Sequence, residues 1–262
     1  MSTQETDHIA ACASIVHKGD PARFRDAMAA PLGLREKLLV LYAFNVEVAR
    51  APWVTAEAMI AEMRLQWWHY ALGEIAAGWA VRRHEVVTPL SEYLTPEQAL
   101  ALQSLVEERR WDIYPDAFAD EAALWTNLSN TTGALMRAAL GLAGTETTPK
   151  LDEGLKAVAL AGWLTAVPAL IGQNRHPLPE TSEGAIVGLA SEGLAKLKTA
   201  RKQPLPKLAR RAILAGWQSE PLLKLALNEP QRVLNGTLEL APFRAKLRLA
   251  RLAFTNLSLI HI

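Results

Sequence analysis

The 262-residue sequence contains a single cysteine, Cys12, and it lacks several other features of common functional sites. One thiol forms neither a disulfide framework nor a cysteine zinc site, and it fits a reducing compartment best. No glycine-rich phosphate loop, nucleophile elbow or histidine pair at metal-ligand spacing is present. No segment alternates between polar and apolar residues as a half-buried strand does. These absences exclude several enzyme classes and favour a helical protein.

Targeting signals and membrane-spanning segments are equally scarce. The first residues include Glu5 and Asp7 without a basic flank, so we expect neither a secretory signal nor a mitochondrial presequence in this form of the chain. No uncharged apolar run reaches the roughly 18 residues needed to span a bilayer. We therefore expect a cytoplasmic protein, either soluble or bound peripherally at the inner face of the membrane.

Charge is unevenly distributed along the chain, although the net charge is only +1. Residues 1–191 contain 15 Lys and Arg against 23 Asp and Glu, a net charge of −8, whereas residues 192–262 contain 13 against 4, a net charge of +9. Either the two regions attract each other within one fold, or the basic region faces an anionic membrane or an acidic partner. No nucleic-acid-binding motif is present, so we expect no nucleic-acid partner.

Half of the residues are hydrophobic and recur at helical spacing, which predicts a single all-α domain over residues 1–262. A helix is predicted over residues 33–51, and Pro52 ends or kinks it. Thr95 with Gln98 has the pattern of a capping box, and Asp120 is a second expected N-cap. Further helices are predicted over 54–79, from Thr95 to Pro115, from Asp120 to Gly141 or Gly144, over 151–171 with a kink at Pro168, over 190–202, 205–217 and 219–227, and from residue 240 onward.

Three aspartates, Asp112, Asp116 and Asp120, stand four residues apart, as the ligands of a helical metal motif would. Pro115 interrupts this spacing, and Asp116 and Asp120 also fit a turn and a helix N-cap. We therefore predict structural roles for these aspartates rather than a metal site.

The end of the chain has a basic amphipathic pattern. Arg244, Arg248 and Arg251 lie on one predicted helical stripe, beside an apolar stripe. Such a helix either lies on an anionic membrane or packs on the domain with its arginines in water. These three arginines are the candidates for a membrane surface.

Several motifs occur in an order that is typical of one enzyme family. They are PLGLREKLLVLYAF (31–44), MRLQWW (63–68), RRWDIYPD (109–116), NTTGALM (130–136) and RHPLP (175–179). In their order and spacing the chain resembles the squalene and phytoene synthases. In the segments AFNVEVA (43–49) and EMRLQWW (62–68) it is most similar to a non-synthase branch that includes the mitochondrial complex I assembly factor and its bacterial relatives. The resemblance implies an isoprenoid synthase fold, with helices around a central cavity.

The resemblance also implies where a metal site would lie. In catalytic members, two aspartate-rich motifs on facing helices hold Mg²⁺, which binds a prenyl diphosphate and stabilises it as it leaves. Here the resemblance places Ala49 and Trp53 at the first and last aspartates of the first motif, with Pro52 between them. Residues 154–179, where the second motif is expected, contain no Asp or Glu. We therefore expect no metal site and no cofactor.

Three functions stay open at this point. The first is a catalytically silent protein that binds an isoprenoid lipid, a prenyl diphosphate, a membrane or a subunit of an assembling respiratory complex, the last suggested only by the resemblance. The second is an active prenyltransferase with an altered site, which would use Mg²⁺. The third is an unrelated helical binding protein. We assign no catalytic residue, and the candidate cavity-lining residues are Tyr42, Asn45, Glu47, Ala49, Arg50, Trp53, Arg64 and Trp67.

Overall fold

A computed structural model describes residues 3–241 and residue 247, with side chains from residue 7 onward. Every described secondary-structure element is a helix, which confirms the all-α prediction. The helix expected from residue 240 onward lies almost wholly outside the described residues, and so do Arg244, Arg248 and Arg251. Their place at a membrane surface stays a prediction.

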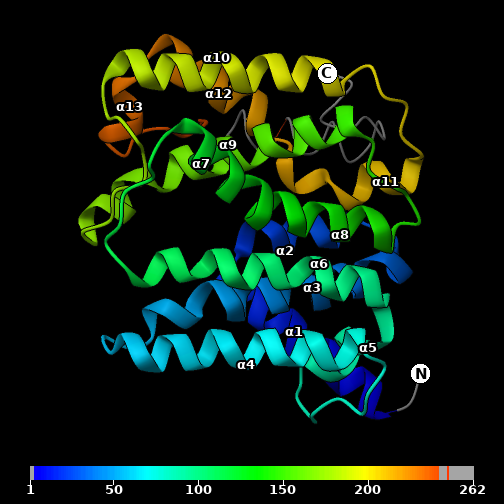
Figure 1. The fold of residues 1–262 in the computed structure, drawn as a ribbon. Helices are drawn as coiled ribbons and strands as arrows, with labels where there is room; N and C mark the ends of the chain where they lie inside the picture. Colours follow the sequence, from blue (N-terminus) through cyan, green and yellow to red (C-terminus); the bar gives the residue numbers. More distant parts are fainter. Residues whose placement is uncertain (1–2, 242–246, 248–262) are drawn as a thin grey trace. The chain divides into compact units, whose positions relative to one another are not determined.

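Backbone proximity divides the chain into two compact units (Figure 1). Unit 1 comprises residues 1–114 and 134–146, and unit 2 comprises residues 115–133 and 147–262. The chain passes from one unit to the other within the segment for which a single helix is predicted, between residues 133 and 134. The prediction of one domain over residues 1–262 stays a prediction.

Unit 1 is built around α3. Its helices are α1 (Thr3–Gly19), α2 (Pro21–Met28), α3 (Leu32–Arg50), α4 (Ala58–Ala76), α5 (Val87–Tyr93), α6 (Pro96–Glu108) and α8 (Ala134–Leu142), with the 3-10 turns η1 (Ala51–Trp53) and η2 (Arg109–Ile113). Residues 38–46 of α3 are all buried, as expected for a helix that is apolar on nearly every side. Helix α3 packs against α1, α5 and α8, while α4 and α6 lie side by side (Figure 1).

Local sequence signals set several helix ends as predicted. Pro52 lies in η1, directly after α3. Thr95 and Gln98 form the predicted capping box, in which the Gln98 N–H donates to Thr95 Oγ1 at 3.3 Å and the Thr95 N–H to Gln98 Oε1 at 3.0 Å. Asp120 accepts the N–H of Ala123 at 2.8 Å. These three predictions are confirmed.

Other predicted boundaries are wrong. The helix predicted over 54–79 begins only at Ala58, because residues 54–57 form a bend. The helix predicted up to Pro115 ends at Glu108 and is followed by the 3-10 turn η2. The helices α1, α2, α5 and α13 have no counterpart in the sequence prediction.

Unit 2 is built around α9. It contains α7 (Glu121–Leu128), the π-helix η3 (Ser129–Gly133), α9 (Pro149–Gly172), α10 (Glu183–Ala200), α11 (Lys207–Ala212), the 3-10 turn η4 (Leu214–Gly216), α12 (Ser219–Asn228) and α13 (Gln231–Leu234). The single helix predicted after Asp120 is therefore divided into α7, η3 and α8. Helix α10 begins before the predicted residue 190, and the predicted helix 205–217 is divided into α11 and η4. Helix α9 contains Pro168, as predicted.

By length and composition, α9 is apolar enough to cross a membrane, contrary to the expectation that no such run exists. Its most apolar 18-residue window has a mean hydropathy of 1.6, and 50% of that window is buried inside the protein. Because α9 packs against α10 and α12, it also has the environment of a core helix.

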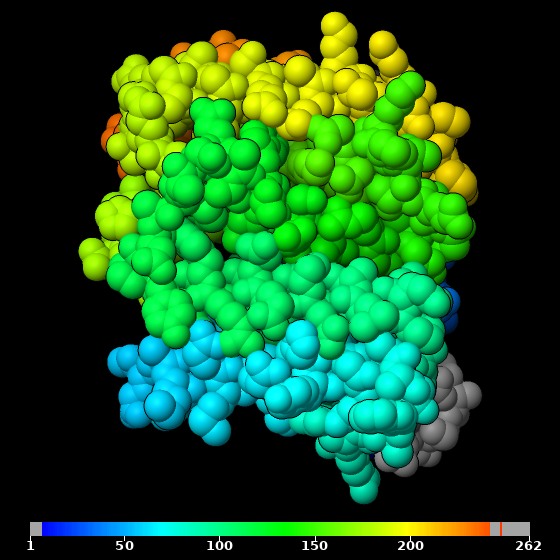
Figure 2. Space-filling view, viewed as in Figure 1, coloured from blue at the N-terminus to red at the C-terminus, as the bar shows by residue number. Residues whose placement is uncertain are grey.

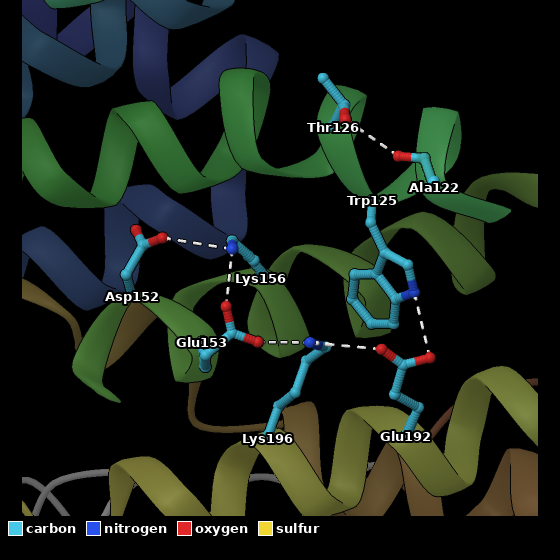
Figure 3. Close-up of polar contacts among 8 residues, drawn as sticks. All are labelled: Ala122, Trp125, Thr126, Asp152, Glu153, Lys156, Glu192 and Lys196. Carbon is cyan, nitrogen blue, oxygen red and sulfur yellow. Dashed lines mark hydrogen bonds and ion pairs between the residues drawn. The ribbon is translucent and has the colours of Figure 1, made fainter. Parts of the chain in front are cut away.

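Two features fix α9 against its neighbours in unit 2. At Gly154, a Cβ atom would come within 2.4 Å of the Cβ of Ala200, so only glycine fits between α9 and α10. Nearby, Glu153 forms ion pairs with Lys196 of α10 and, at 2.6 Å, with Lys156 (Figure 3). The Lys196 ammonium also lies 4.9 Å from the centre of the Trp125 ring, which brings α7 into the same network.

Candidate functional site

One cavity of unit 1 combines charged and aromatic side chains. Its volume is about 420 Å³, which is in the range of small-molecule sites. The end of α3, η1, the bend that follows, α4 and the segment before α5 form its walls. The lining residues are Glu47, Arg50, Ala51, Val54, Ile60, Met63, Arg64, Trp67, Trp68 and His84, and we call this cavity the α3–α4 pocket.

The α3–α4 pocket uses one particular face of α3. Glu47 and Arg50 stand three residues apart on α3 and so share one side of that helix, and Ala51 and Val54 follow them in η1 and the bend. Residues two positions apart point about 200° apart around a helix axis, so Ala49 lies on a different side from Glu47. The pocket is therefore on a different side of α3 from Ala49, one of the two positions at which the family resemblance places the first aspartate motif.

An aromatic cluster connects the pocket to the core. Trp68 is buried, and its ring centre lies 5.5 Å from that of Phe44 and 4.9 Å from that of Trp67, both in edge-to-face geometry. The His84 ring completes the cluster, 5.1 Å from Trp67 and 5.5 Å from Trp68. Such aromatic pairs hold one another in defined orientations, so the wall of the pocket is preorganised.

Arg82 fixes Trp67 from another direction. The carbon of its guanidinium group lies 5.0 Å from the centre of the Trp67 ring, within the range of a cation–π contact. Arg82 Nε donates to Glu74 Oε2 at 3.0 Å, and a second bond joins the same two side chains. This bidentate hydrogen bonding holds the pKa of Glu74 below its usual value. Trp67 is thus in contact with Trp68, His84 and Arg82.

His84 is held as a neutral ring beside the pocket. Its Nδ1 accepts the backbone N–H of Val86 at 3.1 Å and that of Val87 at 3.5 Å, near the start of α5. Burial lowers the pKa of His84, and the charges of Glu85 and Glu47 offset this only in part. A neutral imidazole that accepts at Nδ1 carries its proton on Nε2. His84 therefore has an Nε2–H donor to offer.

Two guanidinium groups and one carboxylate line the pocket. Arg50 Nη1 lies 3.5 Å from Glu47 Oε1, but the Arg50 side chain is still 60% exposed. Arg64 is also exposed. With His84 neutral, the lining is net positive and adds a neutral N–H donor. Such a lining suits a ligand with one anionic and one apolar part.

A second cavity in unit 1 touches the same ion pair. Its volume is about 570 Å³, and it shares Glu47 and Arg50 with the α3–α4 pocket. Lys18 of α1 and Glu85 also line it, so its basic and acidic groups balance, and no aromatic side chain lines it. The α3–α4 pocket is the stronger candidate because it combines an excess positive charge with an aromatic wall.

The structure brings together only part of the predicted site. Glu47, Arg50, Arg64 and Trp67 line the α3–α4 pocket, whereas Tyr42, Asn45, Ala49 and Trp53 do not. Tyr42 is buried, and the centre of its ring lies 5.9 Å from the guanidinium carbon of Arg23. Burial raises the pKa of its hydroxyl group. The assignment of these four residues to a central cavity stays a prediction. The site residues predicted from the sequence did not include His84, which lies just before α5, a helix that the sequence did not predict.

The positions of the expected metal motif do not fit Mg²⁺. Ala49 and Trp53 offer no oxygen ligand, and Pro52 lies between them in η1, outside the regular helix. Among the described residues, no group of three or more His, Cys, Asp or Glu side chains is placed to hold a metal ion. Asp112 is buried, with Arg109 Nη1 at 3.2 Å, and Asp120 caps α7, so both have structural roles.

A family model for squalene/phytoene synthase matches residues 16–219. The chain belongs to the squalene/phytoene synthase family. Among solved structures it is similar to a dehydrosqualene synthase in complex with ligand, with a TM-score of 0.74 and 13% identity over 96% of this chain and 97% of that one. It is also similar to the squalene synthase HpnC from Alicyclobacillus acidocaldarius, with a TM-score of 0.73 and 16% identity over 88% of this chain and 97% of that one. No curated protein sequence matches the chain.

These comparisons confirm the family and its isoprenoid synthase type of helical fold. At 13% and 16% identity, likeness to these two structures shows the fold of this chain but not its activity or its ligands. Membership of the non-synthase branch stays a prediction. What the chain does must be argued from its own residues.

Proposed function

We propose that this chain is a non-catalytic member of its family that binds an isoprenoid lipid or a prenyl diphosphate without a metal ion. The end of α3 is the observation that carries this proposal. Ala49 and Trp53 stand where the family resemblance places two metal-binding aspartates, and Pro52 lies in a 3-10 turn between them. Neither side chain can coordinate Mg²⁺.

The second motif region supports the same conclusion. Residues 154–179 contain no Asp or Glu, and Pro168 stands inside α9 in this region. Condensation of prenyl diphosphates places negative charge on a departing diphosphate, and without a metal ion little stabilises that charge. Binding alone leaves the diphosphate attached, so no such charge has to be stabilised. Loss of both carboxylate sets therefore removes the metal ion that turnover needs, while the arginines of the α3–α4 pocket can still bind an anionic ligand.

The α3–α4 pocket supports a ligand that is anionic at one end and apolar at the other. Arg50 and Arg64 supply positive charge, and His84 supplies a neutral N–H donor. Trp67 and Met63 offer an apolar wall for a hydrocarbon chain. Isoprenoid lipids with a phosphate or diphosphate head group combine these two chemistries.

A pyrophosphate-release assay tests the absence of turnover. The full chain is mixed with farnesyl or geranylgeranyl diphosphate and Mg²⁺, and an active synthase of the family serves as the positive control. We expect no release above the protein-free background. Release that depends on Mg²⁺ and is abolished by Glu47→Gln would overturn the proposal and establish an altered prenyltransferase.

A role in assembling a respiratory complex is a separate part of this proposal. Its support is the likeness of the AFNVEVA and EMRLQWW segments to the non-synthase branch, together with the replaced metal positions. Deletion of the protein should then lower the amount of assembled complex I on native gels, and the Arg64→Ala variant should fail to restore it. Normal assembly in the deletion strain would remove this part of the proposal.

A further inference from the structure

Five large apolar side chains are exposed between the end of α3 and the first turns of α4. They are Trp53 (37% exposed), Val54 (41%), Met59 (76%), Ile60 (38%) and Met63 (65%), and we call them the α3–α4 tip. Their segment is sky blue at the lower left of Figure 2, where it reaches the surface. Exposed apolar clusters of this kind usually mark a binding surface, because water is a poor solvent for them.

We propose that the α3–α4 tip inserts into the surface of a lipid bilayer. The tip spans η1, the bend at residues 54–57 and the first turns of α4, which contain Met59, Ile60 and Met63. The Glu57 N–H donates to Thr55 Oγ1 at 3.1 Å, which helps to hold the bend. Met59 and Ile60 stand four and three residues before Met63, so these three side chains share one side of α4 and can enter the same membrane surface.

The residue types of the tip match those of a membrane interface. Tryptophan favours the head-group region, and methionine, isoleucine and valine favour the acyl chains. Arg50 and Arg64 lie at the rim, where long basic side chains can reach lipid phosphates while their stems stay in apolar surroundings. The tip therefore presents apolar groups at its centre and cations at its edge.

The acids of this segment do little to oppose membrane contact. Glu47 pairs with Arg50 at 3.5 Å, and Glu62 is held by Arg110. Glu57 is exposed on the bend, so the segment as a whole is close to neutral. Apolar insertion rather than attraction to anionic lipid should therefore dominate the binding, which makes it only weakly dependent on salt.

The tip is continuous with the α3–α4 pocket. Val54, Ile60 and Met63 belong to both, so the apolar lining of the cavity passes directly into the exposed cluster. An apolar ligand entering this pocket would cross the tip first. A bilayer at the tip would let such a ligand pass without exposing its hydrocarbon chain to water.

The two methionines of the tip have flexible side chains, which a fluid bilayer can accommodate without fixing their conformations. Met59 and Met63 are the most exposed residues of the tip, and each has three rotatable side-chain bonds. A packed protein interface would freeze these rotamers at an entropic cost, whereas fluid acyl chains leave them free. A second copy of the chain or another protein is therefore the less favourable occupant.

Vesicle flotation with the full chain tests the proposal. Vesicles of phosphatidylcholine alone and of phosphatidylcholine with phosphatidylglycerol are compared at low and high salt. The wild type should float with both. The double variant Met59→Asp and Met63→Asp should lower partitioning by about tenfold or more, because two charges would have to enter the interface. Leu100→Asp, at a 55% exposed position of α6, is the matched control and should bind as the wild type does.

A spectroscopic readout separates insertion from misfolding. Cys12 is fully buried, and burial raises the pKa of its thiol to about 12, so a polarity-sensitive dye should label an introduced Met63→Cys selectively. Its emission should shift to the blue on addition of vesicles, whereas a dye on Leu100→Cys should not respond.

Each other outcome overturns the proposal. Equal flotation of the wild type and the Met59→Asp, Met63→Asp variant would place the membrane contact outside the tip. Binding to anionic vesicles alone, with a strong dependence on salt, would instead point to Arg244, Arg248 and Arg251. If the wild type does not bind vesicles but self-associates through the tip in sedimentation velocity, the tip binds a second copy of the chain. These results do not depend on ligand affinity, so they leave the proposed binding function untouched.

Discussion

His84 Nδ1 accepts the backbone N–H of Val86 at 3.1 Å, so one imidazole both satisfies the backbone near the start of α5 and lines the α3–α4 pocket. The bond requires an unprotonated Nδ1. Packing against Trp67 and Trp68 adds the burial that keeps the ring neutral. The protonation state of His84 therefore couples local stability to the chemistry that the pocket offers a ligand.

The stability of the chain should fall as the pH falls below the ordinary His pKa of about 6.5. Because burial lowers the pKa of folded His84, the unfolded chain binds more protons in this window, and stability must rise with pH there. His84→Asn removes the titration but keeps a side-chain acceptor for the N–H two residues later. Urea unfolding at about pH 7.5 and pH 5.5 should show a larger loss for the wild type than for this variant. Equal losses would contradict a depressed His84 pKa.

Gly154→Ala should destabilise the chain by about 1–3 kcal/mol, because the added Cβ would meet the Ala200 Cβ at 2.4 Å. Gly162→Ala is the matched control in the same helix, since nothing lies within 4 Å of its Cβ. Helix propensity should make that variant about 0.5–1 kcal/mol more stable. Thermal unfolding of both, with Ala200→Gly added to Gly154→Ala as a rescue, checks the contact. If Gly154→Ala is as stable as Gly162→Ala, α9 and α10 are not this close.

Glu153→Gln should weaken the attachment of α10 to α9. Burial raises the pKa of Glu153, but hydrogen bonds from Lys156 and Lys196 outweigh this and hold the pKa below its usual value. Loss of the carboxylate should lower the free energy of unfolding by about 1 kcal/mol, and less at high salt. Glu146→Gln, at an exposed position, is the control. An unchanged denaturation midpoint for Glu153→Gln would mean that the two lysines contribute nothing measurable.

Arg64→Ala should weaken the binding of farnesyl diphosphate by about tenfold, which is the loss of one charge-assisted hydrogen bond. Arg25→Ala should bind as the wild type does, because Arg25 is exposed on α2 and does not line the pocket. Trp67→Ala should also weaken binding, whereas Trp79→Ala, at a 71% exposed position, should not. Isothermal titration calorimetry gives the dissociation constants of the four variants and of the wild type. Full affinity in both Arg64→Ala and Trp67→Ala would place the ligand outside the α3–α4 pocket.

Sequence signals that act over a few residues predicted their structures well. Pro52, Asp120 and the Thr95 capping box all mark helix ends because each acts within one turn. The same kind of signal could have found α2, since Asp20 accepts the N–H of Arg23 at 2.9 Å and Pro21 follows it. The π-helix η3 was not predictable in this way, because its sequence continues a helical pattern.

The candidate site was predictable only in part, because its walls come from segments far apart in the sequence. Glu47 and Arg50 were found from their helix, and Arg64 and Trp67 from a motif. His84 joins them only through tertiary packing, which no local pattern encodes. Family resemblance located the altered metal positions, but it could not show that the pocket uses a side of α3 that differs from that of Ala49.

The metal dependence of ligand binding tests the central claim most directly. The dissociation constant of farnesyl diphosphate is measured by calorimetry in Mg²⁺ and again in EDTA, with an active synthase of the family in parallel. The claim predicts that this chain binds in both buffers with dissociation constants within about twofold, while the synthase loses affinity in EDTA. Binding that appears only with Mg²⁺ would contradict the claim and show that the chain holds a metal-bound diphosphate after all.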